Sequence, residues 1–550
     1  MTAEVPGELR LRPLRPRTLR RLAIALVVLL GALSAYLMLG QARDDSPTFD
    51  EPVYVSAGLL ALREHDLAYN AEHPPLAKAI ATLPVLLTGA TLPPGHVAGT
   101  NDEQSYSAVF LREQRRAGLL GEVTFASRVV PVLTVLVLAG LLFLLGRQLL
   151  GTSGGLLAAA LWLVSPLVLG LGHLDGVDLP FALAVVVLAG ALLHRRHHDD
   201  RRSTVLLGVA LGLCLATSML GLVLVPVVLG VLLVQRRRAA IVPGLVVLAV
   251  AWVVLWASYA VLDVAVVTSP TWLLPTPYVD GLRYLATVPP PSNGYLLGVA
   301  WTGGRWWFWP GSILVKVTTP VLLVLLVGPV AWRYAERTVR RDAFAVLAVP
   351  GLALVAALML SSRDLGVRYL LPTFALWCVG ASALVLVLRP GLVRIASGAA
   401  AVVAAVLLLA SAPHSLAYTS PPFTPAYRVA TDSNVDWGQD FDSLRSWAVG
   451  LSPYVDWFGP RGTSWTDVPG ARDLLAADPA TITGWVAVSA THLTSDHADR
   501  LSWLRAYCPV GTIGGSVLLY RFATPPTADP GPTAPAPPCS GDVSVRTAAG

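Results

Sequence analysis

Apolar runs of about 18 residues or more recur along the 550-residue chain, and they constrain its fold more than any other feature. A helix of that length crosses a hydrocarbon core about 30 Å thick. The composition agrees with membrane insertion, because 54% of the residues are hydrophobic and only 13% are charged, whereas a typical soluble domain has about 25% charged residues. The sequence therefore predicts a polytopic α-helical membrane protein.

The window rule for membrane helices predicts about eleven spans in this chain. They lie near residues 21–40, 123–145, 153–172, 179–193, 203–219, 220–234, 241–261, 312–331, 343–360, 368–388 and 395–412. The first run is long and is not followed by a small-residue cleavage site. We therefore expect it to be a membrane anchor and not a cleaved signal peptide.

Arginine clusters predict the orientation of these spans. When eleven spans are threaded in order, the clusters all fall on one side of the membrane; they lie at 10–21, 195–202, 236–238, 333–341 and 389–394. Because basic loops stay in the cytoplasm, we expect a cytoplasmic N-terminus in the cell membrane and an external C-terminal segment. The net charge of +6 follows from this pattern and gives no reason to expect a nucleic-acid partner.

The chain is predicted to have four parts. These are a basic cytoplasmic tail at 1–20, a transmembrane domain at 21–412, an external α/β domain at 413–523 and a disordered Pro-rich tail at 524–550. Strands are expected in the third part, because residues 485–488 and 517–520 have the pattern typical of strands. Function is expected in the four external segments 41–122, 173–178, 262–311 and 413–550, because the cytoplasmic loops are short.

Two pairs of cysteines fall in different predicted environments. Cys214 and Cys378 lie in predicted spans, where a buried cysteine packs as a small apolar residue. Cys508 and Cys539 lie in the external segment, where the compartment permits a disulfide. The sequence leaves open whether these two form one.

An acidic patch follows the first predicted span. It begins with Asp50 and Glu51 and is followed about twenty residues later by Glu72 and His73, which precede a rigid Pro-Pro pair. A solvated loop is the simple alternative. Two acids and an imidazole beside a low-dielectric surface are also suited to act as a general base or to hold a divalent cation.

Three further charged residues are predicted on the same external face. Asp178 precedes Leu-Pro and fits a helix cap, while Lys316 near a span end fits a cation that snorkels to the interface. Charged groups at this depth also tend to be functional, and the planar fork of Arg368 suits a phosphate. The acidic run 432–440 fails the calcium-loop template, because Trp437 occupies the glycine position; we expect a structural turn or a loop facing a saccharide.

Several motifs, taken in order, resemble a known family. They are the acidic pair at 50–51, Glu-His-Pro-Pro-Leu at 72–76, His173 with Asp178, Leu-Pro-Thr-Pro-Tyr at 274–278, Lys316, Gly-Val-Arg-Tyr-Leu-Leu-Pro at 366–372 and Asp-Ser-Asn-Val-Asp-Trp-Gly-Gln-Asp at 432–440. In this order they are similar to the family 39 type of GT-C glycosyltransferases, which includes protein O-mannosyltransferases and lipid A aminoarabinose transferases. The resemblance runs from about residue 21 to 522. One departure is His73, because aminoarabinose transferases tend to have lysine after the glutamate.

The resemblance implies a membrane-embedded inverting transferase. Its donor would be a sugar on a polyprenyl phosphate or pyrophosphate, and its acceptor a glycan, lipid or protein outside the cell. By position, Asp50 corresponds to the proposed catalytic base, with Glu51 beside it. The residues implied in donor or phosphate binding are Glu72, His73, Asp178, Lys316 and Arg368. No cofactor is implied with certainty, and a divalent metal at Glu72 and His73 stays open.

Two other classes of protein remain open. A transporter or flippase for a lipid-linked substrate would often show internal repeats and charges near the bilayer midplane; the sequence shows no convincing repeat, and its acids gather at one surface. A membrane scaffold that displays the C-terminal domain would tolerate substitution of Asp50 and Glu72.

Overall fold

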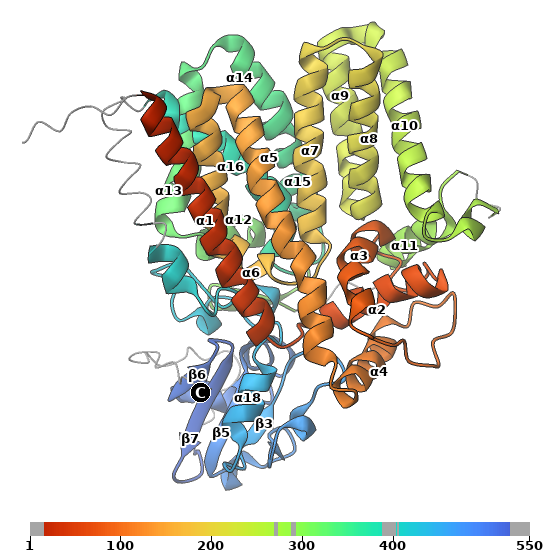
Figure 1. The fold of residues 1–550 in the computed structure, drawn as a ribbon. Coiled ribbons are helices and arrows are strands. Elements are labelled where there is room, and N and C mark those ends of the chain that lie inside the picture. The colour runs from red at the N-terminus through yellow and green to blue at the C-terminus, as the bar shows by residue number, and fades with distance from the viewer. Residues whose placement is uncertain (1–15, 269–272, 288–292, 388–402, 404–405, 528–550) are drawn as a thin grey trace, which may run out of the picture.

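The protein consists of a helical bundle with a small sheet domain at one end (Figure 1). The computed structural model describes residues 16–268, 273–287, 293–387, 403 and 406–527. Six helical stretches in these ranges are long and apolar enough to cross a membrane: Ala23–Asp44, Leu120–Leu163, Asp178–His197, Ile241–Ala260, Arg337–Met359 and Val367–Leu386. The protein is therefore a multi-pass membrane protein, as predicted, but the count of eleven spans is not confirmed.

The first half of the bundle follows the predicted spans closely. Its helices are α1 (Pro16–Asp44), α5 (Leu120–Leu163), α6 (Pro166–Gly172), α7 (Asp178–His197), α8 (Arg201–Thr217) and α10 (Ile241–Ala260). Helix α5 is two helices joined at Gly151, whose φ of 73° favours glycine. The helices before and after Gly151 lie side by side, and the Trp162 indole of one donates to the Val135 carbonyl of the other. The predicted span at 153–172 is thus divided between the end of α5 and α6.

The second half of the bundle contains shorter, interrupted helices. The predicted span 312–331 is divided into α12 (Phe308–Lys316), α13 (Thr319–Val327) and η6 (Gly328–Tyr334), and the break at 317–318 lies just before Pro320. The remaining pieces of this half are α14 (Arg337–Ala343), η7 (Phe344–Ala348), α15 (Val349–Met359), η8 (Val367–Leu370), α16 (Leu371–Ala381) and η9 (Ser382–Leu386). In the first half, η3 (Met219–Val223) and α9 (Leu224–Arg236) lie between α8 and α10. Most of the predicted span 395–412 lies outside the described residues.

Two long loops lie at the end of the bundle that meets the sheet domain (Figure 1). The first contains α2 (Glu51–Leu59), η1 (Leu60–Glu64), α3 (Pro75–Thr82), η2 (Leu83–Leu87) and α4 (Glu103–Arg116). The second contains η5 (Val264–Thr268), α11 (Thr276–Thr287) and a hairpin of β1 (Asn293–Leu296) and β2 (Val299–Thr302). These loops correspond to the predicted external segments 41–122 and 262–311.

The C-terminal region is an α/β domain, as predicted. Its mixed sheet has the order β4-β3-β5-β7-β6, and the helix α18 (Phe441–Ala448) lies beside it (Figure 1). The strands are β3 (Tyr454–Asp456), β4 (Arg472–Asp473), β5 (Gly484–Ser489), β6 (Gly511–Ile513) and β7 (Val517–Phe522). Cys508 is disulfide-bonded, whereas Cys539 lies outside the described residues. Cys214 and Cys378 are free and buried.

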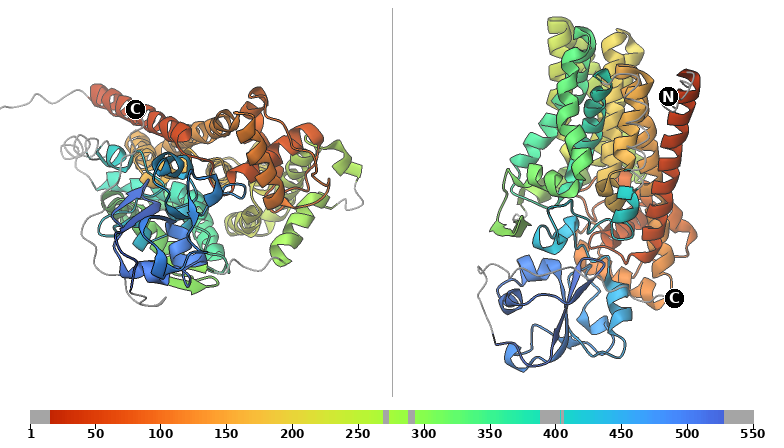
Figure 2. Two further views of the ribbon diagram at one scale, coloured as in Figure 1. Left: turned by 90° about the horizontal axis from the view of Figure 1, so that it is seen from below. Right: turned by 90° about the vertical axis from the view of Figure 1, so that its left-hand side faces the viewer.

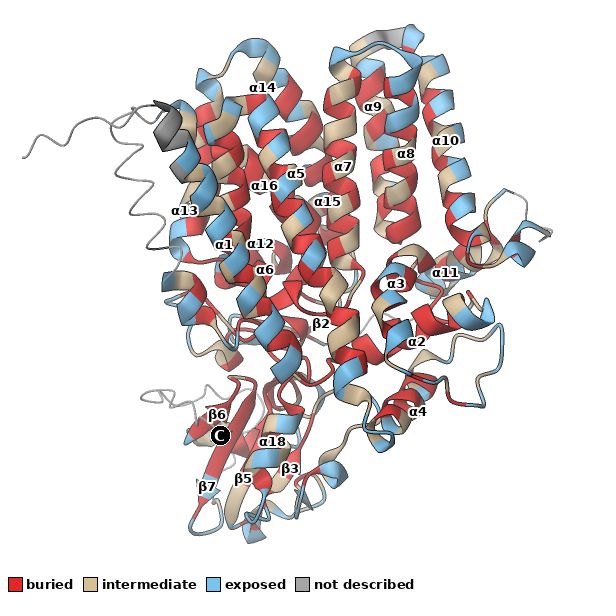
Figure 3. Ribbon diagram, viewed as in Figure 1, coloured by how far each residue is buried: buried red, intermediate tan, exposed pale blue. Residues whose placement is uncertain are grey.

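Exposed positions recur along the outer helices of the bundle (Figure 3), and many of them are large apolar residues. Val28 on α1 and Val253 on α10 are 64% and 55% exposed. An apolar outer surface of this extent is typical of a face that contacts lipid. The N-terminal end of α1 lies at the opposite end of the bundle from the sheet domain (Figure 2).

Candidate functional site

A polar cavity of about 380 Å³ lies where the bundle meets the sheet domain. The start of α2, the first loop, α11, η8 and the turn at 431–437 contribute to its wall. Its polar and aromatic lining includes Asp50, Tyr54, Asn70, Glu72, His73, Glu103, Tyr284, Arg363, Asp364, Arg368, Tyr369, Asp432, Trp437 and Phe458. The structure thus brings together four residues predicted from the sequence: Asp50, Glu72, His73 and Arg368.

Asp50 and Arg368 form an ion pair on the cavity wall. Arg368 Nη1 donates to Asp50 Oδ2 at 2.7 Å, and the Tyr54 hydroxyl donates to the same oxygen at 3.2 Å. The guanidinium also lies over the Trp437 ring, 4.4 Å from its centre. Within the described ranges no donor hydrogen-bonds Asp50 Oδ1, so this oxygen is left to accept from a molecule in the cavity.

Local structure holds Asp50 at the beginning of α2. The Val53 and Tyr54 amides bond to its carbonyl, and Pro52 suits the first turn of the helix. The preceding residue, Phe49, stacks on Phe458 of the sheet domain with ring centres 5.4 Å apart. Asp50 is therefore positioned between a helix of the first loop and the C-terminal domain.

The structure assigns Glu51 to a different role from the predicted catalytic one. Its side chain is 2% exposed and accepts from Arg128 at 2.8 and 2.6 Å and from the Thr48 and Asp175 amides at 2.8 Å each. Burial opposes ionisation, but the Arg128 ion pair outweighs it and lowers the pKa of Glu51. Glu51 ties α2 to α5 and does not line the polar cavity. Arg128, an arginine inside an apolar run, was the signal for this contact.

Glu72 shares its wall of the cavity with an acid that the sequence analysis did not select. Asn70 Nδ2 donates to Glu72 Oε1 at 2.8 Å and to Glu103 Oε2 at 2.7 Å. Burial and the adjacent Glu72 carboxylate raise the pKa of Glu103 to about 8, so Glu103 is protonated at neutral pH. Burial alone would raise the pKa of Glu72, but the hydrogen bond from Glu103 together with the nearby His73 and Lys78 lowers it. The only sequence signal for Glu103 was the acidic pair at 102–103.

His73 is a neutral group beside these acids. Burial lowers the pKa of His73 to about 4, and its ring meets Tyr54 edge-on at 5.6 Å. The Glu72 carboxylate oxygens already accept hydrogen bonds from Asn70, Asn101 and Glu103. A hard cation needs several free oxygen ligands, and these residues therefore do not fit the divalent metal considered at Glu72 and His73.

Lys316 and Asp178 lie outside the lining of the cavity. Lys316 Nζ donates to the carbonyls of Leu416, Tyr418 and Asn434 at 2.7, 2.6 and 2.6 Å. These three bonds use every N–H of the ammonium, so the predicted phosphate contact is replaced by a clamp on the chain at 416–434. The sequence predicted Asp178 as a helix cap, but the N-cap of α7 is Val177; Asp178 is the first helical residue, and its Oδ2 is 3.9 Å from Arg368 Nε.

The acidic run 432–440 begins with a structural turn, and that turn also reaches the cavity. Asn434 Oδ1 accepts from the Val367 amide at 2.8 Å, which holds η8 beside the turn. Gly366 has a φ of 127°, and a side chain there would collide with Ser433. Asp432 lines the cavity, where burial raises its pKa to about 6. The turn thus holds the backbone of η8, and with it Arg368, in place.

An apolar groove of about 780 Å³ adjoins the polar cavity. Its lining includes Ile313, Leu322, Leu326, Phe344, Ala348, Leu352, Val355, Phe374 and Trp377, from α12, α13, η7, α15 and α16. Phe308 and Tyr369 line the cavity, while their sequence neighbours Trp309 and Leu370 line the groove. The ring centres of Trp309 and Tyr369 are 6.3 Å apart. This aromatic pair marks the junction between a polar and an apolar compartment.

Comparisons with known proteins give partial matches. Residues 116–262 match the family model described as dolichyl-phosphate-mannose-protein mannosyltransferase. Among solved structures, ArnT from Cupriavidus metallidurans bound to undecaprenyl phosphate shares 16% identity, with 73% of this chain and 67% of ArnT covered and a TM-score of 0.47. The archaeal oligosaccharyltransferase AglB from Archaeoglobus fulgidus, in complex with an inhibitory peptide and a dolichol-phosphate, shares 12% identity, covering 88% and 72%, with a TM-score of 0.47. A search of curated protein sequences finds no match.

Proposed function

We propose that this protein is an inverting glycosyltransferase that moves a sugar from a polyprenyl-phosphate carrier to an acceptor hydroxyl at the external membrane face. The observation that carries the proposal is the junction of the polar cavity, with Asp50 and Arg368 on its wall, and the apolar groove. A lipid-linked sugar has the same two parts, a charged polar head and an apolar chain. The match over residues 116–262 and the order of the sequence motifs support the same class of enzyme.

The proposed external position of the cavity follows from the arrangement of the chain. The cavity lies at the junction with the sheet domain, whereas the N-terminal end of α1 lies at the other end of the bundle (Figure 2). The basic stretch Arg337–Arg341 belongs to α14, at the end far from the sheet domain (Figure 1). If the basic end faces the cytoplasm, then the cavity and the C-terminal domain face outward.

In the proposed reaction, Asp50 is the general base. Its carboxylate takes the proton of the acceptor hydroxyl, whose oxygen forms a bond to the anomeric carbon. The bond between that carbon and the phosphate oxygen breaks, and its electron pair leaves with the carrier phosphate. Attack in line with the leaving group inverts the configuration, and no nucleophile from the protein is needed.

Arg368 is proposed to stabilise the phosphate as charge develops on it. In the described part of the chain, its Nε is buried without a hydrogen-bond partner. A guanidinium can donate to two phosphate oxygens at once, and a preorganised donor of this kind is a large contribution to such catalysis. The neutral Glu103 acid and the Asn70 amide lie on the wall where sugar hydroxyls would bind.

The test is a transfer assay with purified protein in vesicles, labelled polyprenyl-phosphate mannose and a washed membrane fraction as acceptor. Asp50→Asn should lower transfer by a factor of about 10² to 10⁴, the usual contribution of a general base. The matched control is Asp44→Asn, because Asp44 is an exposed acid six positions earlier. Full transfer by Asp50→Asn would remove Asp50 from the role of base. Movement of the labelled lipid across the vesicle without transfer would favour a flippase.

A further inference from the structure

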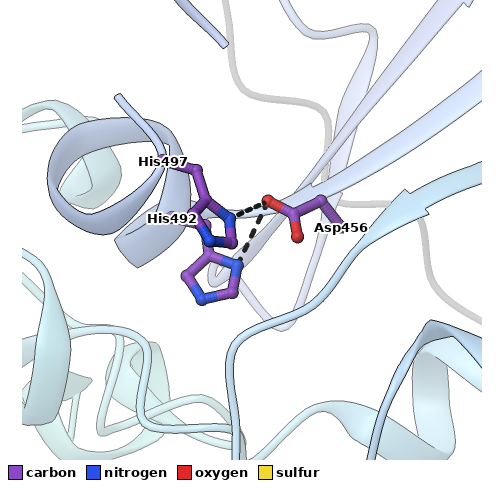
Figure 4. Close-up of side chains that lie close together, drawn as sticks. All are labelled: Asp456, His492 and His497. Atoms are coloured by element: carbon purple, nitrogen blue, oxygen red, sulfur yellow. Dashed lines mark hydrogen bonds and ion pairs between the residues drawn. The ribbon is translucent and has the colours of Figure 1, made fainter. Parts of the chain in front are cut away.

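Three metal-ligating side chains lie together in the sheet domain, outside the lining of the polar cavity (Figure 4). Asp456 is the last residue of β3, while His492 begins the short helix η14 (His492–Asp496) and His497 follows it. Asp456 Oδ2 is 3.1 Å from His492 Nδ1 and 2.8 Å from His497 Nδ1. Over the described ranges, this is the one set of three His, Cys, Asp or Glu side chains whose ligand atoms all lie within 4.8 Å of one another.

The backbone between the two histidines has an unusual form. In an α-helix, residues five apart point about 140° away from each other. Here η14 is a π-helical turn, in which the His497 amide donates to the His492 carbonyl at 3.0 Å. The turn brings the two imidazoles to 4.0 Å between ring centres. π-turns are rare and occur frequently at functional sites, and this one directs both Nδ1 atoms toward Asp456 (Figure 4).

The protein satisfies these three side chains only in part. His497 Nδ1 makes a hydrogen bond to Asp456 Oδ2. His492 Nδ1 is buried and close to the same oxygen, yet it has no hydrogen-bond partner of acceptable geometry in the described part of the chain. Buried polar atoms in folded proteins nearly always have a partner. An atom of this kind, facing a carboxylate and a second imidazole, has the surroundings of a metal ligand.

We propose that Asp456, His492 and His497 bind a divalent transition metal, and that Zn²⁺ fits them best. Two imidazoles and one carboxylate are a common three-residue zinc set, with the fourth position left to water. In a tetrahedral site with ligand bonds of about 2.0–2.1 Å, the ligand atoms lie about 3.3 Å apart. The two measured separations from Asp456 Oδ2 are slightly shorter, so small side-chain rotations admit the ion. The His497 side chain is 29% exposed and leaves a path for entry.

The metal would fasten the rim of the polar cavity. Phe458, two residues after Asp456, lies edge-on to His492 with ring centres 5.5 Å apart and stacks on Phe49, next to Asp50. Thr491 directly precedes His492 in the chain, and its amide donates to Asp436 Oδ2 at 2.9 Å. The ion would therefore join the end of β3 to η14, next to Phe458, which stacks on the residue before Asp50. Its binding is independent of the proposed transfer reaction.

The test is zinc binding by the full chain in detergent, after dialysis against a chelator. Equilibrium dialysis against Zn²⁺ and elemental analysis should give about one bound ion per chain, and Zn²⁺ should raise the melting temperature. His492→Asn, His497→Asn and Asp456→Asn should each weaken binding by more than the roughly 10–100-fold that loss of a second-shell partner causes. Asp456→Asn keeps a hydrogen-bond acceptor, so it remains a usable variant if a histidine variant does not fold.

The control is the double variant His194→Asn with His198→Asn. These histidines also stack, with ring centres 4.2 Å apart, but they do not belong to a three-ligand set. The control should bind zinc like the original protein. The proposal is overturned if the full chain binds no zinc at micromolar concentrations, if Asp456→Asn and His497→Asn keep the original affinity, or if only the control loses it.

Discussion

Asp50 and Glu51 are neighbours in the sequence, yet their side chains have different surroundings. Successive residues at the start of a helix point about 100° apart, so Asp50 faces the cavity while Glu51 faces α5. The Asp50 side chain is 20% exposed, whereas that of Glu51 is 2% exposed and is bound on all sides. One carboxylate is available for chemistry, and the other is part of the buried framework.

Glu51→Ala is expected to destabilise the fold. It leaves Arg128 buried without its counterion, which typically costs about 3–5 kcal/mol. The melting temperature in detergent should fall well below that of Asp50→Asn, whose partner Arg368 keeps Asp178 and Trp437 nearby. If Glu51→Ala melted like the original protein but lost transfer, Glu51 would return as a catalytic candidate.

Glu103 is expected to make stability depend on pH. Its folded-state pKa is raised to about 8, above about 4.3 in an unfolded chain. Its proton therefore stabilises the fold fully below the lower value, and this contribution is lost as pH rises through the higher one. Glu103→Gln cannot titrate, so its melting temperature relative to the original protein should rise between about pH 5 and 9. A difference that stays constant over this range would contradict the shared proton between Glu103 and Glu72.

At the scale of elements, the predictable features are those that depend on local sequence. Hydropathy predicted α1, α7 and α10, and strand-like patterns predicted β5 and β7, because length and periodicity are local properties. The division of 312–331 at residues 317–318 could not be predicted from hydropathy, since the apolar run continues through it. Pro320 is a local signal for that break, whereas the three carbonyls that accept from Lys316 at the end of α12 come from far along the chain.

The candidate site shows the same limit. Topology placed Asp50, Glu72, His73 and Arg368 on one face, and the structure brings these four to one cavity. The sequence could not predict which charged groups have a hydrogen-bonding or ion-pair partner, because these partners are far away in the chain. Arg128 is 77 positions from Glu51. The side chain of Lys316 reaches carbonyls 100 or more positions away.

Lys316→Met is expected to loosen the chain around residues 416–434. Each buried carbonyl left without a donor costs about 1–3 kcal/mol. Amide hydrogen exchange in this segment should become faster, while exchange in β5 and β7 should change little. If exchange stayed unchanged and only donor binding weakened, the ammonium would serve the phosphate, as the sequence first suggested.

At the scale of the whole molecule, two compartments meet at one aromatic pair. The polar cavity lies between the bundle and the sheet domain, and the apolar groove runs between helices of the second half of the bundle. The interrupted helices α12 and α13 contribute to the groove, whereas none of its described lining residues comes from α1, α5, α7, α8 or α10. A polar head and an apolar chain of one lipid, as proposed for the donor, would fit these two compartments.

Ala348→Trp is expected to obstruct the apolar groove. The bulky ring would fill part of the groove in which the carrier chain is proposed to lie, so the KM for a long polyprenyl donor should rise by about tenfold or more, equivalent to about 1.4 kcal/mol. A donor with a chain of two isoprene units should be affected less. The matched control is Ala257→Trp on the exposed face of α10. Equal effects of both variants on both donors would mean that the groove does not hold the carrier.

A density map of the protein with polyprenyl phosphate bound would locate the phosphate and the carrier chain directly. We expect a phosphate within hydrogen-bond distance of Arg368, with Asp50 facing the position of the anomeric carbon and the first isoprene units beyond Trp309 in the groove. A phosphate bound away from Arg368, or a carrier chain on another face of the bundle, would contradict this expectation.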